Sequence, residues 1–155
     1  MDSMIVRRDE VAGYTTNPTD VLRFLLRGDG EMPDITDETL MPGDGPPLHR
    51  HPWMTWEVVV QGRLLVRMGD SDVEVGDGDM YFTAPNVPHS FMVIGDGPAR
   101  VIGVNWPGGF HHLYAEFSAA FASGAPDFGV MAAAAQRHGA EILGPPLAVL
   151  LAGAD

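Results

Sequence analysis

The sequence predicts an all-β fold, a sandwich or barrel of short strands, with a short helical extension at its C-terminal end. Between residues 35 and 106, β-branched and aromatic residues gather in short runs, which Gly, Asp, Asn and Pro separate at intervals of about ten residues. The chain contains 19 glycines and 13 prolines, which suits many turns between strands. Strands do not alternate with long amphipathic segments in this region, which argues against a parallel α/β sheet.

Composition and charge exclude several classes of protein. The 155 residues form one domain that is large enough to bury a core, and the lack of cysteine excludes disulfides and thiolate metal sites. The formal charge of −12 would repel a phosphate backbone, so we expect no nucleic-acid partner. The longest apolar tract near the C-terminal end, residues 147–152, is too short to cross a bilayer, and residues 1–10 lack the apolar run of a signal peptide. We therefore expect a cytoplasmic protein without a membrane partner.

The expected strands follow one another along the chain. Residues 1–20 form an N-terminal arm with a short strand at 5–7, and the apolar run 21–26 is short enough to be a strand that ends at a Gly-Asp-Gly turn. Apolar residues alternate along 63–68, and the Gly-Asp-Ser-Asp turn that follows predicts a hairpin. The remaining strands are expected at 35–41, 57–60, 73–75, 80–83, 89–94 and 100–106.

A change in composition at Pro107 ends the predicted barrel domain, residues 1–106. Apolar residues then recur at helical spacing over 110–121, and Asp127 is a plausible N-cap for a second helix over 128–138. We assign residues 107–155 to a helical extension and a tail with an extended end.

The candidate site begins at a His-x-His pair. Successive strand side chains alternate between faces, so His49 and His51 point the same way, about 7 Å apart along a strand. Thr55 and Glu57 share their parity, and two imidazoles followed by a carboxylate form half of a metal site. His89, which opens another strand-like run, is the expected third ligand.

These residues resemble the two motifs of the cupin superfamily. The first motif is Gly, five residues, His-x-His, three or four residues, Glu, six residues, Gly. Gly43 and Gly62 match its glycines around the histidine pair, whereas Thr55 stands in place of the Glu. The second motif is Gly, five residues, Pro-x-Gly, two residues, His, three residues, Asn. Gly78 and His89 match it, and the replacements are Ala84, Asn86 and Val93.

The resemblance covers residues 43–93 and implies a jelly-roll β-barrel. It also implies a divalent ion, of Fe, Mn, Ni or Zn, held by His49, His51 and His89. The Gly-Pro-Pro-Leu-His-x-His opening is most similar to small quercetin-dioxygenase-like cupins.

Three interpretations of the fourth metal ligand remain open, because Thr55 is a poor ligand for these ions. A bulge after His51 would move Glu57 into the ligand position. Alternatively, three histidines and a water hold the metal, and Glu57 beside them acts as a base. In the third interpretation the metal has been lost and the histidines only shape a polar pocket.

Aromatic residues near the motifs are candidates for substrate binding. Trp53 and Trp56 either stack on a planar substrate or serve as core or dimer contacts. Phe91 shares the parity of the third histidine and is expected to line the cavity. His111 and His112 are expected to be solvated or to cap a helix, because neighbouring helix positions do not face one point.

The resemblance implies a metal-dependent oxidoreductase, a dioxygenase similar to quercetinase that acts on a small apolar or aromatic molecule, with Glu57 as the catalytic base. A cupin isomerase, cyclase or dehydratase that uses acid–base chemistry, with or without metal, is one alternative. A non-catalytic small-molecule-binding cupin is another. The resemblance also implies a homodimer, in which residues 1–26 are candidates for an exchanged segment.

Overall fold

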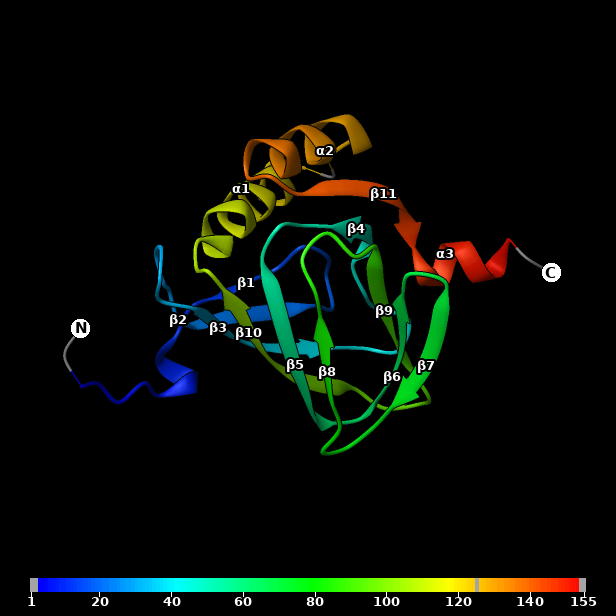
Figure 1. Cartoon of the computed structure of the whole chain (residues 1–155), viewed down its shortest axis with the longest axis horizontal. Helices are drawn as coiled ribbons and strands as arrows, with labels where there is room; N and C mark the ends of the chain where they lie inside the picture. Colours follow the sequence, from blue (N-terminus) through cyan, green and yellow to red (C-terminus); the bar gives the residue numbers. More distant parts are fainter. Residues whose placement is uncertain (1–2, 125, 154–155) are drawn as a thin grey trace.

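Two antiparallel sheets face each other and form a β-barrel with helices along one side (Figure 1). The computed structural model describes residues 3–124 and 126–153. The first sheet has, in spatial order, the strands β1 (Gly13–Tyr14), β2 (Val21–Leu26), β3 (Asp34–Leu40), β10 (Ala99–Trp106), β5 (Met54–Gln61) and β8 (Met80–Thr83). The second sheet has β11 (Glu141–Pro146), β4 (Pro47–Arg50), β9 (His89–Ile94), β6 (Arg63–Met68) and β7 (Ser71–Val75). The predicted jelly-roll architecture is confirmed.

The main core fills the space between the two sheets. Strand residues alternate between the core and the solvent, as in β10, where every second residue is buried. Burial of each such Val or Leu side chain contributes about 1.5–3 kcal/mol to stability. The buried core residues are Leu40, Val59, Leu64, Val66, Tyr81, Phe91, Val93, Ala99 and Val101.

The N-terminal arm differs from its prediction. Residues 5–7 are not a strand; a 3-10 helix, η1 (Arg8–Glu10), precedes β1 instead, and Arg8 pairs with the buried carboxylate of Asp37 at 3.1 Å. Strand β2 pairs with β1 and β3 of its own chain. Homodimer formation stays a prediction, which light scattering at micromolar concentration tests.

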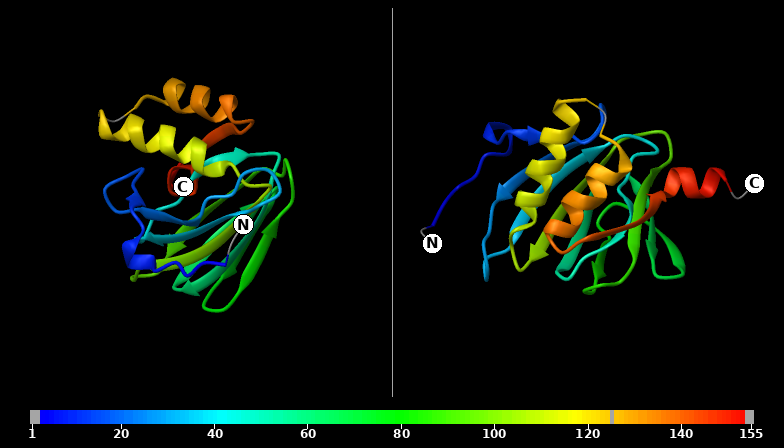
Figure 2. Two further views of the ribbon diagram at one scale, coloured as in Figure 1. Left: turned by 90° about the vertical axis from the view of Figure 1, so that its left-hand side faces the viewer. Right: turned by 90° about the horizontal axis from the view of Figure 1, so that it is seen from above.

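The C-terminal segment contributes to both layers of the fold. Helices α1 (Phe110–Ala122) and α2 (Phe128–Arg137) lie side by side along the barrel, whereas α3 (Leu147–Ala152) lies apart from them (Figure 2). The prediction of a purely helical extension with an extended tail is incomplete, because β11 pairs with β4 and α3 follows it. Within the described residues, no helix is long and apolar enough to span a bilayer.

The predicted cap of α2 is confirmed, since the Asp127 carboxylate accepts a hydrogen bond from the backbone N–H of Val130 at 2.9 Å. Asp127→Ala leaves that N–H without its partner and is expected to lower the free energy of unfolding by about 1 kcal/mol. Urea unfolding measures the change. Asp70→Ala, which truncates an exposed turn residue, is the control and should change stability by less than half as much.

Candidate metal centre

Two neighbouring strands and the turn that follows one of them bring the three histidines together. His49 of β4 lies directly opposite His89, the first residue of β9. His51 follows the last residue of β4. The chain then leaves this sheet at Pro52 and enters the opposite sheet as β5. The expected continuous strand from His49 to Glu57 is therefore wrong, because β4 ends at Arg50 and Glu57 lies on β5 of the opposite sheet.

The three imidazoles form a compact cluster. One ligand nitrogen from each of His49, His51 and His89 lies within 4.8 Å of the other two. The ring centroids of His49 and His89 are 4.2 Å apart, and that of His51 lies 4.6 Å from His89 and 5.5 Å from His49. These distances allow a single ion to contact all three rings after small side-chain adjustments.

Backbone carbonyls fix the orientation of each ring. The Nδ1 atoms of His49, His51 and His89 lie 2.7, 3.0 and 2.8 Å from the carbonyl oxygens of Pro47, Trp53 and Val87. A carbonyl only accepts, so each Nδ1 carries the proton and donates it, and each Nε2 keeps its lone pair for a metal. All three rings therefore present the same ligand atom, and the donor set fits a divalent transition ion.

Burial keeps the cluster uncharged. Desolvation, together with the proximity of His89, lowers the pKa of His49 and of His51 to about 3. Desolvation also lowers the pKa of His89. At neutral pH the three rings are neutral, so a metal ion does not have to displace protons from them.

Thr55, which replaces the Glu of the first motif, is committed to a different contact. Its buried hydroxyl donates to the side-chain oxygen of Asn105 on β10 at 2.9 Å. Strand pairing places Asn105 and Thr83 on either side of Thr55. Thr55 thus forms part of a polar row across the sheet.

Thr55→Val keeps the shape of the side chain and removes its hydroxyl. The buried Asn105 oxygen then loses a hydrogen bond, so the free energy of unfolding is expected to fall by about 1–3 kcal/mol. Urea unfolding of the metal-free protein measures this cost, and Thr55→Ser, which keeps the hydroxyl, is the matched control. An unchanged stability in Thr55→Val would contradict the assigned hydrogen bond.

Glu57 lies on the inner face of β5, opposite Tyr81 on β8 and Gly103 on β10. Its carboxylate does not belong to the histidine cluster, so the structure does not support Glu57 as a metal ligand. Burial raises the pKa of Glu57 to about 7, and the Tyr81 hydroxyl opposes this rise. The side chain can therefore exchange a proton near neutral pH, as the second interpretation requires.

Polar and acidic side chains lie near Glu57 inside the barrel. Gly103 leaves room there, because a Cβ at this position would come within 2.5 Å of the Thr36 hydroxyl. Desolvation and the charges of Asp20 and Glu57 raise the pKa of Glu38 well above its ordinary value. Sequence reasoning missed Tyr81 and Glu38, although each shares inward parity with buried residues of its strand.

The predicted substrate-binding aromatics lie in three different environments. Trp53 stacks on His51, with ring centroids 4.2 Å apart and planes 2° from parallel, and it packs against α1 and α2. Phe91 belongs to the main core. Trp56 points to the outer face of β5 and contacts Phe82 at 5.2 Å between centroids. Trp56 has the opposite parity to Thr55 and Glu57, which favours the packing alternative over substrate stacking for this residue.

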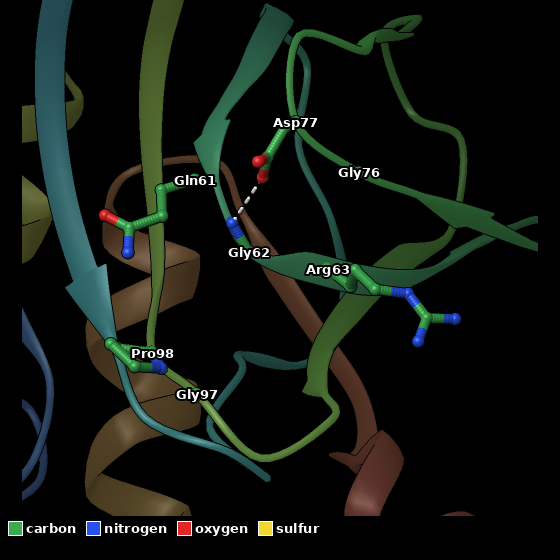
Figure 3. Close-up of a pocket in the computed structure, with 7 residues that line it drawn as sticks. All are labelled: Gln61, Gly62, Arg63, Gly76, Asp77, Gly97 and Pro98. Carbon is green, nitrogen blue, oxygen red and sulfur yellow. Dashed lines mark hydrogen bonds between the residues drawn. The ribbon is translucent and has the colours of Figure 1, made fainter.

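A hollow of about 560 Å³ lies elsewhere, among the turns that end β5, β7 and β9 (Figure 3). Glycine and proline form most of its wall, the backbone N–H of Gly62 donates to Asp77 at 2.7 Å, and Arg63 is paired with Glu74. The strands run from these turns to the histidines at their other ends, so the hollow is separate from the cluster.

Comparison with known proteins agrees with this geometry. Residues 36–105 match the family model of the cupin domain. Over this stretch the chain is similar to cupin domains. A curated relative, the uncharacterized protein MJ1618 of Methanocaldococcus jannaschii, is 25% identical over 104 residues, which cover 64% of this chain and 82% of the relative.

Solved structures share the cupin fold. The polyketide cyclase RemF from Streptomyces resistomycificus is 22% identical, with a TM-score of 0.58 over 67% of this chain and 79% of that chain. A predicted oxalate decarboxylase from Thermotoga maritima is 20% identical, with a TM-score of 0.59 over 66% of this chain and 97% of that chain. A cupin sugar phosphate isomerase from Silicibacter pomeroyi is 16% identical, with a TM-score of 0.56 over 66% and 74% of the two chains. At these identities the likeness establishes the fold of this chain and leaves its reaction open.

Proposed function

We propose that this cupin is a metal-dependent enzyme that transfers a proton on a small apolar or aromatic molecule with an acidic hydrogen beside a carbonyl or phenol. The observation that supports this most directly is Glu57, a carboxyl with a pKa of about 7 inside the barrel whose mouth holds three neutral histidines. From the inner face of β5 it would act on a molecule that enters from the histidine end.

The chain's own residues would divide the work. The Nε2 atoms of His49, His51 and His89 would hold a divalent ion, which supplies Lewis-acid polarisation of a substrate oxygen. Glu57 would take the proton as a general base and return it at another atom of the substrate. The apolar core beneath, which includes Phe91 and Val93, would exclude bulk water from this exchange.

Oxygenation, as in quercetinase-like cupins, is the second candidate. The observation that favours it is a ligand set of three histidines without a carboxylate, which leaves more than one coordination position free for small ligands. Both candidates begin with the same proton removal, so Glu57 has the same role in each.

One experiment separates the candidates. Protein loaded in turn with Fe²⁺, Mn²⁺, Ni²⁺ and Zn²⁺ is mixed in D₂O with a panel of 1,3-diketones and hydroxylated aromatic ketones, while proton NMR and an oxygen electrode follow each sample. Deuterium exchange without oxygen uptake supports proton transfer, and oxygen uptake supports oxygenation. If every compound that binds is returned without exchange or oxidation, both proposals fail and a non-catalytic binding protein is favoured.

A further inference from the structure

A second group of metal-ligating side chains lies outside the barrel mouth, where the turn after β2 meets the start of α1. Asp29 belongs to this turn, and His111 and His112 are the second and third residues of α1. One nitrogen of each ring and one carboxylate oxygen of Asp29 lie within 4.8 Å of one another. The two rings converge, with centroids 4.0 Å apart, although neighbouring helix positions ordinarily diverge.

The backbone holds the two segments in fixed relation. Gly30 and Gly108 form an isolated β-bridge, and the backbone N–H of Gly108 donates to the carbonyl of Met32 at 2.9 Å. The indole N–H of Trp106 donates to the carbonyl of Glu31, also at 2.9 Å. Asp29 and the first turn of α1 are therefore preorganised relative to each other before any ion binds.

Asp34 orients His111. Its fully buried carboxylate lies 2.9 Å from Nδ1 of His111 and also accepts from the backbone N–H groups of Gly28, Gly109 and His111 at 2.8, 3.0 and 3.2 Å. The carboxylate leaves Nε2 of this largely buried ring free as an acceptor. A histidine held in this way by a carboxylate is the usual partner arrangement of a metal ligand.

The other two ligands lie at the surface and already approach each other. His112 Nε2 lies 3.2 Å from Asp29 Oδ1, and both side chains are more than half exposed. In a tetrahedral zinc site with bonds of about 2.0–2.1 Å, neighbouring ligand atoms stand about 3.3 Å apart. The carboxylates of Asp29 and Asp34 attract a cation. The attraction from Asp34 is partly offset by the backbone N–H groups that donate to it.

We propose that Asp29, His111 and His112 form a second metal site, which takes a divalent ion that prefers imidazole, such as Zn²⁺ or Ni²⁺, with water in the fourth position. The ion would fasten the turn after β2 to α1. This site does not depend on the histidine cluster of the barrel or on the proposed reaction.

Equilibrium dialysis with Zn²⁺ at low micromolar concentration tests the proposal. Wild-type protein is expected to bind two ions per chain, and His112→Ala and Asp29→Asn one each. The double variant His49→Ala/His89→Ala should keep the ion that depends on His112. In that background, Zn²⁺ at 100 times its Kd should raise the melting temperature by about 8 °C, and adding His112→Ala should abolish the rise.

Two controls make the result decisive. His138→Ala removes an imidazole that is hydrogen-bonded to Glu116 and belongs to neither cluster, and it should leave two ions bound. His112 is exposed, so unfolding of the metal-free His112→Ala protein should match the wild type. Failure of the barrel cluster to bind metal would remove one ion and leave the His112-dependent ion in place. Binding that persists in an Asp29→Asn/His112→Ala double variant beyond the barrel ion, or binding to this surface only at millimolar Zn²⁺, would overturn the proposal.

Discussion

Replacement of His49 by alanine is expected to remove the metal ion from the histidine cluster and to abolish turnover. The substitution removes one of three imidazole ligands, which contributes about 3 kcal/mol or more to the free energy of metal binding. The affinity for the metal should therefore fall by about 100-fold or more. His49 is less buried than His51 and His89, so its truncation disturbs the core least. Elemental analysis of protein purified without chelators, followed by competition with a chelator of known affinity, measures the loss.

His138→Ala is the matched control, because its ring is partly buried and carries one hydrogen bond, as the ring of His49 does. It should leave metal content and turnover unchanged. The ion assigned to Asp29, His111 and His112 should also remain in His49→Ala, so one ion per chain is the expected count. Full retention of both ions by His49→Ala would contradict the barrel cluster as a metal centre.

The clustering of the three histidines could be predicted from the sequence, because each of the two motifs is a short, contiguous stretch of the chain. One motif is a His-x-His pair between correctly spaced glycines, and the other places a histidine at the start of a strand. A two-sheet barrel is enough to bring them together, and β4 and β9 do pair at His49 and His89. The strands over 21–26, 63–68 and 89–94 were predicted with their observed bounds because alternation and turn residues delimit them.

The wrong predictions concern connections between elements. The parity argument placed His49, His51 and Glu57 along one strand, yet the chain changes sheets at Pro52, a residue without a backbone N–H for the ladder. The strand β11 was missed because its sequence, Glu-Ile-Leu-Gly-Pro-Pro, lacks alternation and is ordered by its pairing with β4. Side-chain parity within β5 could have placed Trp56 outside, because Thr55 and Glu57 were already expected inside.

His111 and His112 were expected to be solvated or to cap the helix, but the structure brings their rings close together. The structure gives His111 a buried carboxylate partner in Asp34, 77 residues away in sequence, and no local pattern could have indicated that contact. Long-range partners of this kind decide whether a helix-terminal histidine is a ligand or a surface residue.

Glu57→Gln is expected to reduce turnover by about 100-fold or more, because the amide cannot accept the substrate proton. In the wild type the base is active only when deprotonated, so the rate should rise with pH through about 7, the pKa that burial gives this carboxyl. A bound divalent ion nearby lowers that pKa, so the midpoint should lie at about 7 or below. The rising limb should vanish in the variant, and kcat/KM measured from pH 5 to 9 tests this. Asp96→Asn, in an exposed turn, is the control and should keep the full profile.

The same substitution should stabilise the metal-free protein at alkaline pH. A carboxyl whose folded pKa is raised from 4.5 to about 7 binds a proton more tightly in the folded state, so its cost to folding grows as pH rises from about 4.5 to 7 and is complete above that range. Glu57→Gln removes this cost, up to about 3 kcal/mol at pH 8, and the gain should disappear near pH 4.5. Urea unfolding at pH 4.5 and pH 8 measures it. A Glu57→Gln protein that is inactive and no more stable than the wild type at pH 8 would mean that neighbouring groups stabilise the charged Glu57 carboxylate in the folded protein. Its carboxylate would then be a structural group rather than a base held ready for a substrate.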